Sequence, residues 1–139
     1  MVDRAVLARK VAAIRDAVAR VADVLPPTAE AFAADRTLRE VVTFNVFLAL
    51  QESIALAMHW LADEGQAVPA TYGEVFLALA ERGVIDTALA SRLRAAAGLR
   101  NLIAHQYGVV NFHRVFAVAR DETGDLITFC QQLASHAAE

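Results

Sequence analysis

The chain has 139 residues, 57% of them hydrophobic, and a formal net charge of −3. This length suits one ordinary domain and allows a buried core, so we expect residues 1–139 to form a single domain. Alanine and leucine supply much of the apolar fraction, and there are only three prolines and six glycines, which is typical of helical proteins. Taken alone, the negative net charge disfavours a nucleic-acid-binding protein.

The sequence also predicts a cytoplasmic protein that does not cross a membrane. Its most apolar run, residues 41–50, is short and contains Asn45. Charged residues stand within the first four positions, so no signal peptide is expected. The single cysteine, Cys130, excludes an internal disulfide and any metal site with several cysteine ligands. We expect Cys130 to be an inert side chain rather than a nucleophile.

Apolar residues recur with helical spacing along the chain, and no strand pattern of period two stands out. In chain order, helices are predicted over about 3–25, 35–64, 71–82, 86–107 and 111–135, and residues 121–124 could interrupt the last one. The boundaries come from Pro26-Pro27, from caps at Asp35, Thr71 and Asp86, and from stops at Gly83 and Gly108. Thr71 to Glu74 fit a capping box. The predicted fold is an all-α, up-and-down bundle of about five helices.

Positive charge gathers in one window although the whole chain is acidic. Residues 87–120 contain five arginines and no Asp or Glu, so the window carries +5 and the rest of the chain −8. The five are Arg92, Arg94, Arg100, Arg114 and Arg120. A local positive field of this kind suits a phosphate backbone. An arginine-bearing helix face that is simply solvated would give the same pattern.

Several chemistries lack their motifs in this chain. The sequence has no Glu-x-x-His or His-Glu-x-x-His pair for a metal in a helical bundle. It also has no phosphate-binding glycine loop and no Gly-x-Ser-x-Gly nucleophile turn. We therefore expect neither a bound metal nor a cofactor.

The helix predicted over residues 86–107 carries the side chains of chemical interest. At about 100° per residue, the expected core face is formed by Leu99, Leu102, Ile103 and Gln106. On the opposite side, a seam of small residues that includes Ala97 and Ala104 is flanked by Arg100, Asn101, His105 and Tyr107. A second helix or a ligand backbone could approach such a seam closely.

An arginine and a histidine on this side suit metal-independent RNA cleavage. Histidine exchanges protons near neutral pH, so His105 can take a proton from a ribose 2′-hydroxyl or give one to the leaving oxygen. Arg100 supplies a permanent charge and a fork of donors to the phosphate. The two lie about 140° apart around one helix, which favours a composite site in a homodimer over a site in one chain. A surface arginine and a hydrogen-bonded histidine without any function would show the same spacing.

The string from Gly98 to Tyr107 resembles the signature of the HepT branch of the HEPN superfamily, Arg-Asn-x3-His-x-Tyr. Residues 50–54, 69–76 and 79–85 resemble the same family at the same distances, so the resemblance spans residues 35–112. It implies a dimeric, all-helical ribonuclease, the toxin of a type VII-like toxin–antitoxin pair. The implied partner is an MntA-like nucleotidyltransferase antitoxin, and tRNA is a candidate substrate.

Roles for single residues follow from this resemblance. Arg100 and His105 would be the catalytic pair, Asn101 would support their geometry, and Tyr107 would accept AMP from the antitoxin. The added phosphate and nucleoside would block the RNA site by charge and bulk together. For Tyr107 the alternative is a ring that packs under Gly108. For the protein the alternatives are a catalytically silent helical module that binds the nucleotidyltransferase, or a nucleotide-binding accessory subunit.

Overall fold

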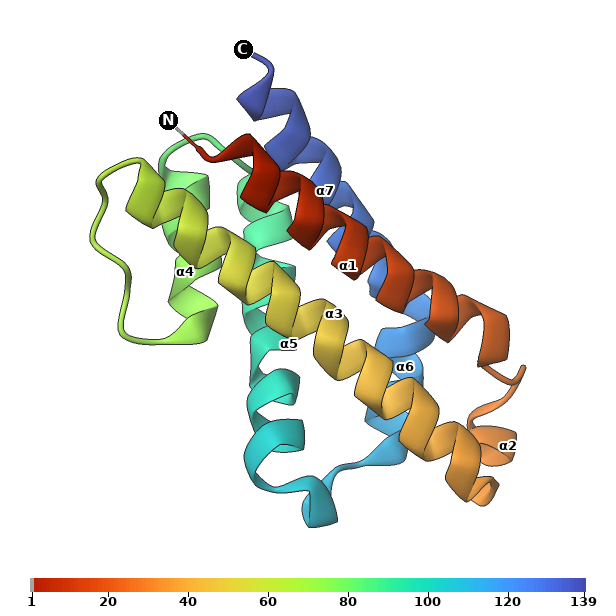
Figure 1. Cartoon of the computed structure of the whole chain (residues 1–139). Coiled ribbons are helices and arrows are strands. Elements are labelled where there is room, and N and C mark those ends of the chain that lie inside the picture. Colours follow the sequence, from red (N-terminus) through yellow and green to blue (C-terminus); the bar gives the residue numbers. More distant parts are fainter. Residues whose placement is uncertain (1) are drawn as a thin grey trace.

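A computed structural model describes residues 2–139, which form seven α-helices, one 3-10 turn and, within that range, no strand (Figure 1). The helices are α1 (Arg4–Val24), α2 (Ala29–Ala34), α3 (Arg36–Asp63), α4 (Tyr72–Glu81), α5 (Thr87–His105), α6 (Phe112–Asp121) and α7 (Thr123–Ala137). The 3-10 turn η1 (Tyr107–Val109) joins α5 to α6. The predicted all-α class is confirmed.

The expectation of about five helices was too low at two places. After Pro26-Pro27 the chain forms α2, and the Thr28 hydroxyl caps it by accepting a 3.1 Å hydrogen bond from the Ala31 backbone N–H. Its six residues are too few to display a hydrophobic repeat, although they bury Phe32 completely. The C-terminal helix is divided at Glu122 into α6 and α7, inside the stretch where the sequence allowed an interruption.

Helix α3 forms the centre of the molecule, and α1 runs alongside it in the opposite direction (Figure 1). It also contacts α2, α4, α5, α6 and α7. Side chains around most of its circumference are therefore buried, among them Val42, Val46, Leu50, Ile54 and Trp60. Within residues 2–139, α3 is the one helix long and apolar enough to cross a membrane. Its central position accounts for that hydropathy, because a helix surrounded by other helices is apolar on most sides.

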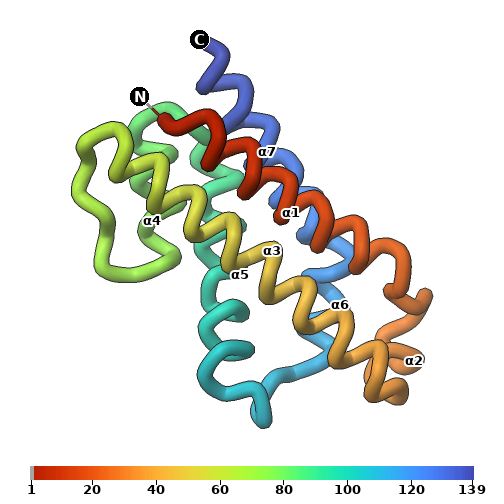
Figure 2. The backbone as a smooth tube through the Cα atoms, viewed as in Figure 1, coloured from red at the N-terminus to blue at the C-terminus, as the bar shows by residue number. Residues whose placement is uncertain are grey.

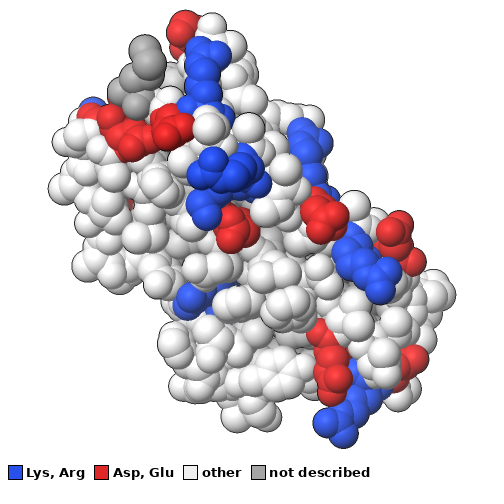
Figure 3. Space-filling view, in the orientation of Figure 1, with Lys and Arg blue, Asp and Glu red and all other residues white. Residues whose placement is uncertain are grey.

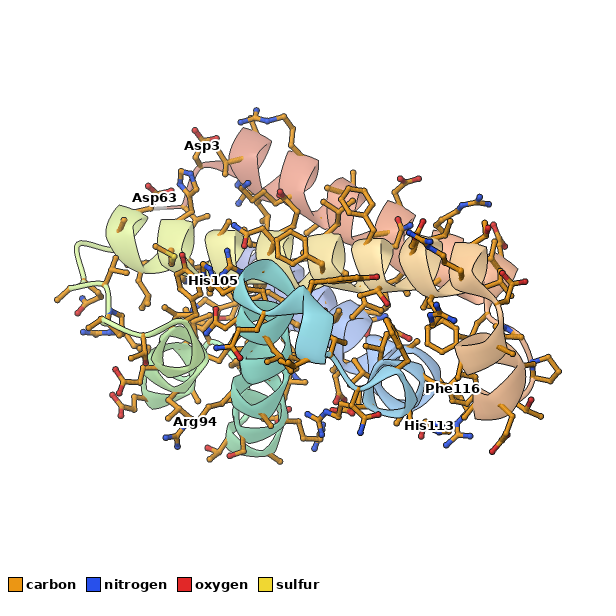
Figure 4. All side chains as sticks on the ribbon, turned by 90° about the horizontal axis from the view of Figure 1, so that it is seen from below. Asp3, Asp63, Arg94, His105, His113 and Phe116 are labelled. Atoms are coloured by element: carbon orange, nitrogen blue, oxygen red, sulfur yellow. The ribbon has the colours of Figure 1, made fainter. Side chains whose placement is uncertain are left out.

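The start of α1 and the end of α7 lie near each other, so both termini are on the same side of the molecule (Figure 2). The Arg4 guanidinium donates a 2.8 Å hydrogen bond to the carbonyl of Ala137, which joins the start of α1 to the end of α7. The Asp3 backbone N–H donates to the Asp63 carboxylate at 3.0 Å, which joins α1 to the end of α3 (Figure 4). The last turn of α5 lies at the other end of the molecule (Figure 1).

The N-terminal end of α5 is fixed by Asp86. Its carboxylate accepts 2.7 Å hydrogen bonds from Nε2 of Gln132 on α7 and from the Leu89 backbone N–H. These bonds to Gln132 and Leu89 lower the pKa of Asp86 below its usual value. Gly83 ends the preceding helix as predicted, with a φ of 73° that glycine adopts without strain. Helix α5 therefore starts from a fixed point and crosses behind α3 in the view of Figure 1.

The C-terminal end of α5 differs from the prediction. The helix ends at His105 instead of Tyr107, and Gln106 follows with a φ of −141°. Gly108 is not its stop, because Gly65 and Gly83 are the glycines with positive φ in residues 2–139. Gly108 lies inside η1 instead. Tyr107 therefore stands in a separate turn, and the helical wheel that placed it beside Arg100 does not apply to it.

Candidate active site

Arg100 lies in the middle of the buried face of α5, and not opposite that face as the helical wheel predicted. Only 9% of its surface is exposed, and its buried neighbours on the helix are Leu93, Ala96, Ala97, Leu99 and Ile103. Ala97, which was assigned to an open seam, is a core residue at which α5 packs against its neighbours. The helical wheel misplaced Arg100 and Ala97 because an alanine can lie in a core or at a surface seam, while an arginine is expected at the surface.

Residues from three helices hold the Arg100 guanidinium. Its Nε donates a 2.7 Å hydrogen bond to Oε1 of Gln51 on α3, and a terminal nitrogen donates at 3.0 Å to Oδ1 of Asn101. Its central carbon lies 4.7 Å from the ring centroid of Tyr72 on α4 and 5.5 Å from that of Phe47 on α3. Such cation–π contacts stabilise a guanidinium most when it is shielded from water. The side chain is thus held in one place.

Among the described residues, no carboxylate pairs with this buried cation. Arg100 takes part in none of the ion pairs formed by residues 2–139. A guanidinium has five N–H donors. Gln51 and Asn101 accept from two of them, which leaves three without a partner in the described part of the chain. A buried charge without a counterion is costly, so the site is suited to an anion such as a phosphate group.

Gly73 allows Tyr72 to reach Arg100. A Cβ atom at Gly73 would lie 3.0 Å from Cγ of Arg94 on α5, which is closer than side chains normally approach. The missing side chain lets the first turn of α4 press against α5 and places the Tyr72 ring over the guanidinium. Thr71 is the N-cap of α4, as predicted, but its side chain makes no capping hydrogen bond, so the predicted capping box does not form.

His105 is the last residue of α5, and Figure 4 shows it well apart from Arg94 of the same helix. The His105 side chain is exposed and forms no hydrogen bond or ion pair with the described residues. Arg100 turns inward to α3 and α4, and no hydrogen bond connects it to His105. Asn101, also exposed, is the predicted site residue that does contact Arg100.

Tyr107 stands in η1 and is 43% exposed. Its ring meets the ring of Phe112 edge-on, with centroids 6.1 Å apart and planes at 70°. The ring therefore packs against Phe112, the first residue of α6. Tyr107 is nevertheless open to solvent.

An apolar cleft of about 350 Å³ is lined by Glu40, Phe44, Phe47, Ile103, Ala104 and Tyr107, and the Phe47 ring also contacts the Arg100 guanidinium. Four large hydrophobic side chains are exposed in residues 2–139, and three of them, Phe44, Tyr107 and Val109, lie in this cleft or the adjoining turn. Figure 3 shows that the surface over the last turns of α5 and the neighbouring part of α3 is mostly uncharged. Exposed apolar patches are common at surfaces through which proteins interact.

The positive window is weaker than the sequence suggested. Arg92 pairs with Asp125 at 3.1 Å, and Arg120 pairs with the adjacent Asp121 at 2.8 Å. Both carboxylates lie outside residues 87–120 in the sequence but next to these arginines in the fold. They therefore neutralise two of the five positive charges of the window. His113 lies on α6, well away from His105 in Figure 4. Arg94, Arg100 and Arg114 form no ion pair with the described residues, so three of the five arginines keep their charge.

Cys130 lies in the core, where burial raises the pKa of its thiol to about 11. A thiol with so high a pKa is protonated at neutral pH and is a poor nucleophile, as expected. In residues 2–139, no three His, Cys, Asp or Glu side chains come together in a cluster that could hold a metal ion.

Three residues of the Arg100 site were missed by the sequence analysis: Phe47, Gln51 and Tyr72. Gln51 lies 49 positions before Arg100, and helical spacing gives no information about such distant contacts. One signal was present, because Gln51 is a polar residue in the apolar middle of a helix. Buried polar side chains usually have a specific hydrogen-bonding partner.

The fold and the site together define an all-helical protein that holds an unneutralised arginine between three helices, with an exposed histidine at the end of the same helix. Residues 14–133 match the model of the family Ribonuclease HepT-like. The chain belongs to this family, and the resemblance drawn from its sequence is confirmed.

Relatives of known identity agree with this assignment. Over 124 residues the chain is 26% identical to the mRNA nuclease HepT of Shewanella oneidensis, which covers 89% of this chain and 92% of that protein. A tri-AMPylated HEPN toxin of Shewanella oneidensis, solved in complex with an MNT antitoxin, has a TM-score of 0.85 at 25% identity over 94% of this chain and 97% of that one. A toxin–antitoxin complex with AMP-PNP shares the fold, with a TM-score of 0.86 at 24% identity over 94% and 98% of the two chains.

Proposed function

We propose that this protein is a metal-independent endoribonuclease and the toxin of a toxin–antitoxin pair. The observation that carries the proposal is Arg100, a buried and oriented guanidinium that has no carboxylate partner and three free donors. A preorganised cation stabilises the negative charge that develops on a phosphate during cleavage. The exposed His105 at the end of the same helix supplies a group that can carry a proton.

In the proposed reaction the ribose 2′-oxygen attacks the adjacent phosphorus. The His105 imidazole accepts the 2′-hydroxyl proton while the new oxygen–phosphorus bond forms, and the resulting imidazolium gives that proton to the departing 5′-oxygen as its bond to phosphorus breaks. The products are a 2′,3′-cyclic phosphate and a free 5′-hydroxyl. Arg100 binds the non-bridging oxygens, and Asn101 helps to hold Arg100.

The proposed active form is a homodimer. The apolar cleft and the adjoining turn offer Phe44, Tyr107 and Val109 to a second copy, and this surface is largely uncharged. Ala104 lines the same cleft and directly precedes His105. A two-fold contact there would therefore bring the histidine of one copy close to the site of the other. This arrangement would complete a site that one chain leaves without a bond between Arg100 and His105.

The proposed partner is an MntA-like nucleotidyltransferase antitoxin that transfers AMP to Tyr107. Support comes from the tri-AMPylated Shewanella oneidensis toxin, which was solved with its MNT antitoxin, and from the exposure of Tyr107 beside the cleft. An attached AMP adds a negative charge and a nucleoside where RNA would lie. We expect this pair to act in the cytoplasm.

RNA cleavage in EDTA tests the nuclease directly. Purified wild-type protein should cut single-stranded RNA in EDTA, and Arg100→Ala and His105→Ala should each lower the rate by at least about a hundredfold. Arg9→Ala and His59→Ala, which remove the same residue types from exposed positions on α1 and α3, serve as matched controls. Circular dichroism and sedimentation must show all four variants folded and assembled like the wild type. If the two site variants cut RNA as fast as the controls, the active site lies elsewhere in the protein. If no protein, the wild type included, cuts RNA, the protein is a silent interaction module.

A further inference from the structure

The contact between Gln51 and Arg100 points to a role for Gln51 in the proposed nuclease. We infer that Gln51 is a positioning residue: its neutral amide orients the guanidinium of Arg100 without neutralising the charge that binds phosphate. The inference rests on the proposed function and gives Gln51 of α3 a specific role at the Arg100 site.

The direction of the hydrogen bond determines which donors stay free. Gln51 Oε1 accepts from Nε, the donor nearest the chain, at 2.7 Å. The two terminal nitrogens then keep three N–H groups for a ligand, since Asn101 uses only one. Phe47 lies one helical turn before Gln51 on α3 and offers its ring to the same guanidinium. Helix α3 therefore supplies both an acceptor and a ring, which together restrict how the planar group can turn.

A carboxylate lies next to Gln51 in the sequence, but it does not reach Arg100. Glu52 directly follows Gln51, yet its carboxylate pairs at 2.9 Å with Nζ of Lys10 on α1 and not with Arg100. A carboxylate at position 51 would form a charge-assisted pair with the buried guanidinium. Such a pair would hold the side chain equally well, but it would cancel the positive charge that attracts phosphate. The amide holds Arg100 and leaves its charge available.

Two nearly isosteric variants separate orientation from charge. Gln51→Glu keeps the acceptor and adds a negative charge, and Gln51→Met keeps the volume and removes the acceptor. We expect Gln51→Glu to lower kcat/KM for RNA by about a hundredfold, comparable to loss of a donor to the transition state. Gln51→Met should lower kcat by about tenfold with little change in KM, because the cation remains but is less well oriented.

The salt dependence of oligonucleotide binding provides a second measurement. A substitution at a residue with a purely structural role would not change it. The probe is a fluorescent single-stranded oligonucleotide with 2′-deoxy sugars, which cannot be cleaved by attack of a 2′-hydroxyl. For wild type, the logarithm of the binding constant falls linearly with the logarithm of salt concentration, by about 0.7 for each phosphate contact. Gln51→Glu should make this slope shallower by about 0.7 per site, and Gln51→Met should leave it unchanged. Gln131→Glu, which adds the same charge at an exposed position on α7, is the matched control.

The outcomes separate this inference from the proposed function. If wild type cleaves RNA and both Gln51 variants match Gln131→Glu in rate and slope, the inference is wrong and the nuclease stands. If wild type binds the oligonucleotide but cleaves no RNA, the nuclease is wrong, and the slope of Gln51→Glu still decides whether Gln51 protects the charge of Arg100. If wild type neither binds nor cleaves, both are wrong. Should Gln51→Glu fail to fold, the kcat of Gln51→Met decides the positioning role.

Discussion

Replacing Phe44 with alanine should dissociate the proposed homodimer. Phe44 is 59% exposed, and since a phenylalanine side chain covers roughly 200 Å², about 120 Å² of it lies open on each chain. At about 25 cal/mol per Å², covering this area contributes about 3 kcal/mol per copy. A two-fold interface contains the residue twice, so the total is about 6 kcal/mol. Alanine would retain about a third of it, so about 4 kcal/mol is lost and the dimer Kd rises about a thousandfold.

Sedimentation velocity over a dilution series measures this Kd. Val68→Ala is the matched control, because Val68 is also an exposed apolar residue, 40% accessible, but lies in the loop between α3 and α4. RNA cleavage should fall in parallel with the dimer fraction of Phe44→Ala and recover at high protein concentration. A wild type that is monomeric at every concentration, or a Phe44→Ala dimer as tight as the control, would refute the assignment of this surface.

Three further predictions concern the site and the core. When Arg100→Ala and His105→Ala proteins are mixed and allowed to reassociate, they should regain about a quarter of wild-type activity. About half of the dimers then contain one chain of each variant, and each of these holds one intact Arg100–His105 pair across the interface instead of two. A mixture as inactive as its components would argue against a composite site. Co-expression with the antitoxin should add adenylyl groups to the intact mass of the wild type but not of Tyr107→Phe, and modified Tyr107→Phe would place the AMP elsewhere. Burial raises the pKa of the Cys130 thiol to about 11, so the folded state keeps a proton that the unfolded state loses above about pH 8.5. The stabilisation that comes from the protonated thiol is therefore complete below about pH 8.5 and is lost as the pH rises toward 11. Urea unfolding between about pH 8.5 and 11 should show a shallower loss of stability in Cys130→Ala than in wild type, and equal slopes would contradict the assigned cause.

Much of the site could be located from sequence because its residues are close together in the chain. Arg100, Asn101, His105 and Tyr107 lie within one short string, and that string was sufficient to predict the family that residues 14–133 confirm. Gln51 and Tyr72 could not be assigned in this way. They reach Arg100 from other helices, and their contacts depend on how α3 and α4 pack against α5.

The helical class, most helix boundaries and the stop at Gly83 could be predicted from the sequence, because spacing, caps and backbone conformation act over a few residues. The tertiary structure alone decided that Arg100 is buried and that its charge is left unneutralised. A helical wheel gives the angle of each side chain but not the neighbours that surround it. Because α3 and α4 pack against the face of α5 that carries Arg100, a residue expected at the surface became the centre of the candidate site.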